Sequence, residues 1–148
     1  MAFLGFLHVT CVNKLDGLSE QQARATPLAT SPAVSALGVI KHLTSVQRQH
    51  IQHSIGGCEL PSLWAEGDDE HEWRVRVGET ISSVIADFDA EWVRSQETMA
   101  EADWDAEVLV HGSGVRVGRL LVDVLQEQAR HVGHLDVVRE LIDGSVGE

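Results

Sequence analysis

The chain of 148 residues carries 11 lysines and arginines against 23 aspartates and glutamates, a formal net charge of −12. This charge repels phosphate backbones and no basic run offsets it locally, which argues against nucleic-acid binding. A length of 148 residues predicts a single domain over residues 1–148, and a hydrophobic fraction of 43% is typical of a soluble globular protein.

The N-terminal residues 1–12 are apolar, but the stretch is short and lacks the basic start of a signal peptide. We therefore interpret it as a helix and expect no membrane association. Cys11 and Cys58 lie far apart and without metal-ligand spacing, which is typical of reduced thiols and favours a cytoplasmic protein.

Residues 3–15 repeat apolar side chains every three or four positions, which predicts a first amphipathic helix that ends at Asp16-Gly17. Ser19 with Gln22 predicts a short capped helix that stops before Pro27.

A second long helix is predicted from Ala36 to Ile55, with Ser35 as its N-cap and Gly56 after its end. It carries three histidines, at positions 42, 50 and 53. With 100° per residue, His50 falls inside the apolar arc and His42 at its edge, so periodicity alone favours His50 as the inward residue.

The residues from Cys58 to Gly78 form a long connection whose acidic part, residues 66–72, predicts a solvated loop. A third helix with a nearly heptad apolar stripe follows from Thr80 to Glu101. Residues 112–114 (Gly-Ser-Gly) predict a turn in the last connection, and we expect no strand of more than a few residues.

The fourth helix is predicted over Val117–Ile142. His131 lies inside its apolar arc, and Glu127, one turn earlier, lies on the shoulder of that arc. Such a pair is either a hydrogen-bonded core pair or half of a metal site. Four long amphipathic helices with one extended connection predict an all-α, up-down four-helix bundle with one long crossover, a fold that can converge metal ligands from facing helices.

Several segments together resemble the DinB superfamily, and within it the actinobacterial branch classed as a domain of unknown function. The similarity runs from about residue 13 to residue 144, with matching order and spacing. The segments that carry it are Lys14–Arg24 (KLDGLSEQQAR), Leu37–Leu43 (LGVIKHL), Trp73 with Gly78–Thr80 (GET), Glu127–His134 (EQARHVGH) and Arg139–Gly144 (RELIDG).

The resemblance implies a divalent metal held by His42, Glu127 and His131, with glutamate in place of the first histidine of a His-x-x-x-His pair. Zinc is the first choice, and Ni²⁺, Fe²⁺ or Mn²⁺ suit the same donors. His134 could serve as a ligand, as a partner behind the ligands or as a substrate contact, and Asp123 as a partner behind Glu127. Whether His50 is also a ligand stays open.

Three protein ligands leave coordination positions open, which is the pattern of a catalytic metal. The resemblance implies thiol-dependent S-transfer, in which the metal activates a low-molecular-weight thiol such as mycothiol or bacillithiol against a small electrophile. Metal-assisted isomerase, lyase or cyclase chemistry and a non-catalytic binding or scaffold bundle are the alternatives. The expected partner is a small molecule, and a homodimer is plausible for a bundle of this size.

Overall fold

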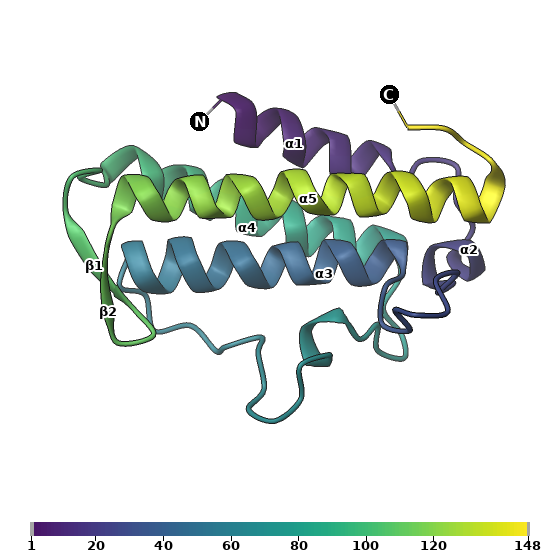
Figure 1. The fold of residues 1–148 in the computed structure, drawn as a ribbon, viewed down its shortest axis with the longest axis horizontal. Helices are drawn as coiled ribbons and strands as arrows, with labels where there is room; N and C mark the ends of the chain where they lie inside the picture. The colour runs from purple at the N-terminus through teal and green to yellow at the C-terminus, as the bar shows by residue number, and fades with distance from the viewer. Residues whose placement is uncertain (1, 148) are drawn as a thin grey trace.

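In the computed structural model, which describes residues 2–147, four long helices pack into a bundle (Figure 1). This confirms the predicted all-α class. The helices are α1 (Ala2–Asn13), the short α2 (Glu20–Arg24), α3 (Ala36–Gln47), α4 (Ile81–Glu101) and α5 (Val117–Asp143).

The long helices follow an up-down-down-up order. In Figure 1, α1 and α5 run in one direction, and α3 and α4 run in the other. The crossover between α3 and α4 makes this possible, because it returns the chain to the end of the bundle at which α3 began. As a result α3 contacts both α4 and α5, and α5 also covers α1.

The predicted helix starts are confirmed by their caps. The Ser35 hydroxyl accepts a hydrogen bond from the Gly38 amide at 3.0 Å, and Ser19 and Gln22 form a reciprocal capping box. Thr80 caps α4 in the same way, with Ser83 returning the bond.

Beyond Gln47 the second long helix continues as a π-helix, η1, over Arg48–Ile55. Its carbonyls accept from groups five residues later, as in the bond from the Gly56 amide to the Ile51 carbonyl at 2.9 Å. This wider turn shifts the following side chains away from the positions that α-helical arithmetic assigns them. Ile51 is therefore fully buried, whereas His50 is only partly buried.

Two features of the connections were not predicted. A hairpin of two four-residue strands, β1 (Glu107–Val110) and β2 (Ser113–Arg116), links α4 to α5. A short 3₁₀ turn, η2 (His71–Trp73), packs on α3 from the crossover. The solvated loop predicted for the acidic stretch is thus wrong at Glu72, whose side chain is only 11% exposed.

Two apolar clusters form the core. On α4 and α5 the buried polar residues fall between the two clusters along each helix. One cluster includes Leu37, Leu43, Phe88, Leu135 and Val138; the other includes Leu4, Val46, Met99, Leu121 and Val124; the buried polar residues between them include Glu91, Ser95, Gln128 and His131.

Helix α1 is apolar on both faces. Its outer side exposes Phe3, Phe6 and Val9, each more than half accessible. No second chain is described, so the homodimer expected from the sequence stays a prediction. None of the helices within residues 2–147 combines the length and the apolar character that crossing a membrane requires.

We expect Gly38→Ala to destabilise the protein, because a Cβ at this position would lie 2.9 Å from the carbonyl oxygens of both Ala33 and Trp73. Overpacking against backbone should lower the free energy of unfolding by about 1–3 kcal/mol, measured by urea denaturation. Gly133→Ala is the matched control. Nothing lies within 4 Å of its new Cβ, so the control should gain about 1 kcal/mol from helix propensity.

Candidate metal centre

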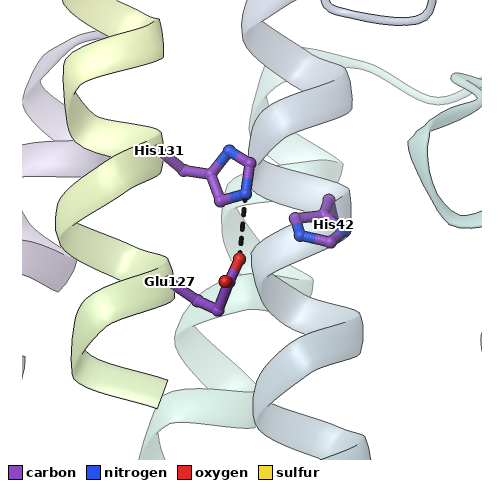
Figure 2. A group of neighbouring side chains, drawn as sticks. All are labelled: His42, Glu127 and His131. Carbon is purple, nitrogen blue, oxygen red and sulfur yellow. Dashed lines mark ion pairs between the residues drawn. The ribbon is translucent and has the colours of Figure 1, made fainter. Parts of the chain in front are cut away.

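Side chains from α3 and α5 meet between these two helices. His42 comes from α3, and Glu127 and His131 come from successive turns of α5 (Figure 2). Each offers one potential ligand atom, and these three atoms lie within 4.8 Å of one another. The structure therefore brings together the three residues that the DinB resemblance pointed to. It does not include His50 or His134 in this group.

Both ring nitrogens of His131 have partners on its own helix. Nε2 lies 3.3 Å from Glu127 Oε2, and Nδ1 lies 3.0 Å from Nδ1 of His134. Either ring can carry the proton, so either Nδ1 can donate this hydrogen bond to the other. The ring is thus fixed from both sides, and its Nε2 faces the Glu127 carboxylate and the side of α3 (Figure 2).

Two carboxylates of α5, Glu127 and Asp123, are each paired with an arginine. Glu127 Oε1 accepts a hydrogen bond from Arg130 at 2.8 Å. Asp123, one turn before Glu127, is bound by the guanidinium of Arg119 at 3.0 and 3.1 Å. Asp123 thus faces the same side of α5 as Glu127, but the contact found for it is with Arg119.

His42 is held by the crossover. Its ring stacks on the indole of Trp73, with centroids 4.0 Å apart and planes 10° from parallel. Nδ1 of His42 lies 3.4 Å from Glu72 Oε1, close enough for an ion pair but not aligned for a hydrogen bond. Both ring nitrogens of His42 are consequently buried without a hydrogen-bond partner.

Sequence reasoning missed Glu72. It lies in a run of acidic residues that is typical of a solvated surface, and its partner, His42, is 30 residues earlier in the chain. The neighbouring Trp73 was the available signal, because a tryptophan inside a charged connection indicates a segment that packs on the core.

Burial keeps the two histidines neutral. It lowers the pKa of His42 to about 4, together with a smaller effect of the nearby His134. It also lowers the pKa of His131 to about 4, with smaller effects in the same direction from His42 and His134. Both imidazoles therefore present a free lone pair at neutral pH, the form in which histidine binds a metal.

A cavity of about 350 Å³ opens beside the three residues. His42 and Glu127 are among the residues that line it. The other residues of its wall are Val46, His50, Trp64, Asp123, Gln126 and Arg130. A small molecule in this cavity would therefore touch two of the three converging side chains.

The donor set suits a divalent metal. Two neutral imidazoles and one carboxylate are typical of Zn²⁺ sites with open positions, and they also accommodate Ni²⁺, Fe²⁺ and Mn²⁺. Tetrahedral bonds of about 2.1 Å place ligand atoms about 3.4 Å apart. The three atoms lie within 4.8 Å of one another, so side-chain movements of about 1 Å would complete the site. Such an ion would satisfy one of the two unpartnered nitrogens of His42.

A helical bundle with a long crossover, in which two histidines and a carboxylate converge between facing helices, defines a DinB-like protein. Residues 1–144 match the family model for mycothiol S-transferase, and the chain belongs to this family. No curated protein matches the chain. The family match confirms the DinB-type resemblance read from the sequence and its connection to mycothiol-dependent transferases.

We expect the metal-free protein to lose stability as the pH falls from 7 to 5. An unfolded histidine takes up a proton near pH 6.5, whereas folded His42 and His131 do so only near pH 4. Between these values the unfolded state binds more protons, so the loss is on the order of 2 kcal/mol per imidazole at pH 5. Chemical denaturation in the presence of chelator measures it.

The variant His42→Gln removes the contribution of His42 to this pH dependence, because glutamine takes up no proton in this range. Its free energy of unfolding should fall less steeply between pH 7 and pH 5 than that of the parent protein. Equal slopes for the two proteins would mean that His42 is not held neutral by burial.

Proposed function

We propose that the protein is a metal-dependent mycothiol S-transferase that joins the thiol sulfur of mycothiol to an electrophilic small molecule. The observation that carries the proposal is the convergence of two neutral, buried histidines and one carboxylate beside a cavity, in a chain of the mycothiol S-transferase family. In this proposal His42, Glu127 and His131 are the metal ligands.

The metal, when bound, would supply a Lewis acid that lowers the pKa of a thiol close to it. The chain's own residues define where the reaction takes place. The two imidazoles are neutral and Glu127 carries one negative charge, so a bound divalent ion would keep a net positive charge. This charge would attract an anionic sulfur. The sulfur then forms a bond to the electrophilic carbon, the leaving group departs with its electron pair, and the thiol proton passes to solvent.

His134 acts as a positioning residue for His131. If Nε2 of His131 binds the metal, its proton must sit on Nδ1, and the atom in reach of that proton is Nδ1 of His134, 3.0 Å away. A hydrogen bond of this kind fixes both the tautomer and the orientation of a metal-binding histidine. Asp123, which lines the cavity beside its Arg119 partner, is proposed to accept a hydrogen bond from bound substrate.

We expect about one divalent ion per chain in protein purified without chelator, measured by inductively coupled plasma mass spectrometry. His42→Ala and His131→Ala should each lose the ion and at least about a hundredfold in the rate of mycothiol conjugation to a bromomethyl electrophile such as monobromobimane. The rate is followed by the fluorescence of the conjugate, with the uncatalysed reaction subtracted.

His53→Ala is the control, because His53 is a histidine of the same long helix that lies outside the converging group. It should keep both the metal and the rate. A parent protein free of metal, with a melting temperature unchanged by chelator, would contradict the proposal and favour a non-catalytic bundle. A protein that holds metal but conjugates no thiol would favour isomerase, lyase or cyclase chemistry.

Glu72→Gln should weaken metal binding about 10- to 100-fold. Nδ1 of His42 lies 3.4 Å from Glu72, and if Nε2 bound the metal a small shift would let Nδ1 donate to this carboxylate, which would orient the ring and raise its basicity. Competition with a fluorescent zinc chelator measures the affinity. Glu70→Gln is the matched control. It makes the same change of charge two residues away, at an exposed position of the same connection, and should leave the affinity unchanged.

A further inference from the structure

The outer face of helix α1 carries no charge. None of the twelve residues of α1 is acidic or basic, although the chain as a whole has a formal charge of −12. Figure 1 shows α1 at the edge of the bundle, and among residues 2–147 no other helix covers its outer face. The exposed residues of that face are Ala2, Phe3, Phe6, Val9 and Asn13. A contiguous apolar surface of this kind is typical of a site that contacts another molecule.

A small apolar cavity lies beside this face. Its volume is about 140 Å³, and none of the eight residues that line it is charged. Phe3 contributes to its wall from α1, Trp104 from the connection after α4, and Val122 from α5. The ring of Phe6 stacks on that of Phe3, with centroids 5.9 Å apart. An exposed phenyl ring and an apolar cavity are therefore neighbours on the same surface.

We propose that this surface is the interface of a homodimer with twofold symmetry, in which Phe6 of each chain fills the cavity of the other. In a twofold interface both chains use the same patch, so a side chain that inserts must lie close to the cavity that receives its counterpart. Phe6 and the cavity have this arrangement. An apolar cavity of about 150 Å³ can hold one benzene molecule, so a cavity of about 140 Å³ suits one phenyl ring.

The extent of the apolar surface agrees with a dimer. Phe3, Phe6 and Trp104 are 57%, 61% and 48% exposed, and Val9 and Val122 are more than half exposed. From the area that each side chain loses when it is fully buried, these five residues would remove about 300–500 Å² of apolar surface from water. This surface would form the apolar centre of a standard interface, which buries about 800 Å² on each chain and has a polar rim.

The charge distribution favours a second copy of the chain over a membrane. Two chains with a formal charge of −12 each repel one another, and they do so least where the surfaces in contact are uncharged. A helix that binds a membrane surface instead carries lysines and arginines beside its apolar face, which attract the anionic headgroups. Helix α1 has neither residue type.

A dimer of this kind would leave the converging residues accessible. Val122 and Leu125 of α5 line the cavity beside α1. Asp123 and Glu127 line the separate cavity beside the proposed metal ligands. The two cavities therefore use different sides of α5, and dimerisation is independent of the chemistry proposed above.

Sedimentation velocity of the full chain, from low to high micromolar concentration, tests the proposal. The parent protein should sediment as a dimer. Phe6→Ser should raise the dissociation constant of the dimer at least about 30-fold, the effect of losing an aromatic residue that contributes strongly to binding. Val122→Glu places a charge at the cavity and should act in the same direction. Both residues are exposed in the single chain, so circular dichroism should show the helix content of the parent in both variants.

Val77→Glu is the matched control. It makes the same change as Val122→Glu at a fully exposed valine of the crossover, which lies across the bundle from α1 (Figure 1), and it should stay dimeric. A parent protein that is monomeric throughout the concentration range would overturn the inference, and so would a dimer that both the Phe6 and the Val122 variants leave intact. Binding of a monomeric parent to vesicles of phosphatidylcholine and phosphatidylglycerol would assign the α1 face to a membrane instead.

Discussion

The structure depends on two imidazoles that are buried in neutral form between α3 and α5, and one of them, His42, leaves both ring nitrogens without a hydrogen bond. Unsatisfied buried polar groups cost about 1–3 kcal/mol each, so the surrounding packing must hold them in place. Trp73 covers one ring of the pair, and His134 and Glu127 hold the other from both sides. The apolar clusters on either side supply the stability that this polar layer does not.

The crossover has both a topological and a chemical role. It makes α3 and α4 parallel, which leaves α3 free to face α5, and it lays Glu72 and Trp73 against the exposed side of His42. Earlier in its sequence, the crossover also contributes Trp64 to the cavity wall. Long connections with little regular structure commonly carry function on a rigid scaffold. Here the helices provide the converging side chains, and the crossover decides what surrounds them.

Local signals in the sequence were sufficient to predict the helices and half of the site. Ser35 and Thr80 define helix starts through contacts within three residues, and the period of α5 places His131 inward. Periodicity did not predict which histidine of the second long helix joins the site. The π-helical turn after Gln47 changes the angle per residue, and only the DinB resemblance pointed to His42. Glu72 depends on a partner 30 residues away. The hairpin, with four-residue strands, is too short to show a pattern.

The positions of the three converging residues along the sequence also have a consequence for how the chain folds as it is synthesised. His42 is made early, whereas Glu127 and His131 belong to the last helix, so a nascent or truncated chain that lacks α5 has one of the three proposed ligands. An ion held across α3 and α5 would bind the native state and not its precursors, and would add to native stability in proportion to the logarithm of its free concentration. The metal supply of the cell would then influence how much of this protein survives as folded chains, in addition to its activity.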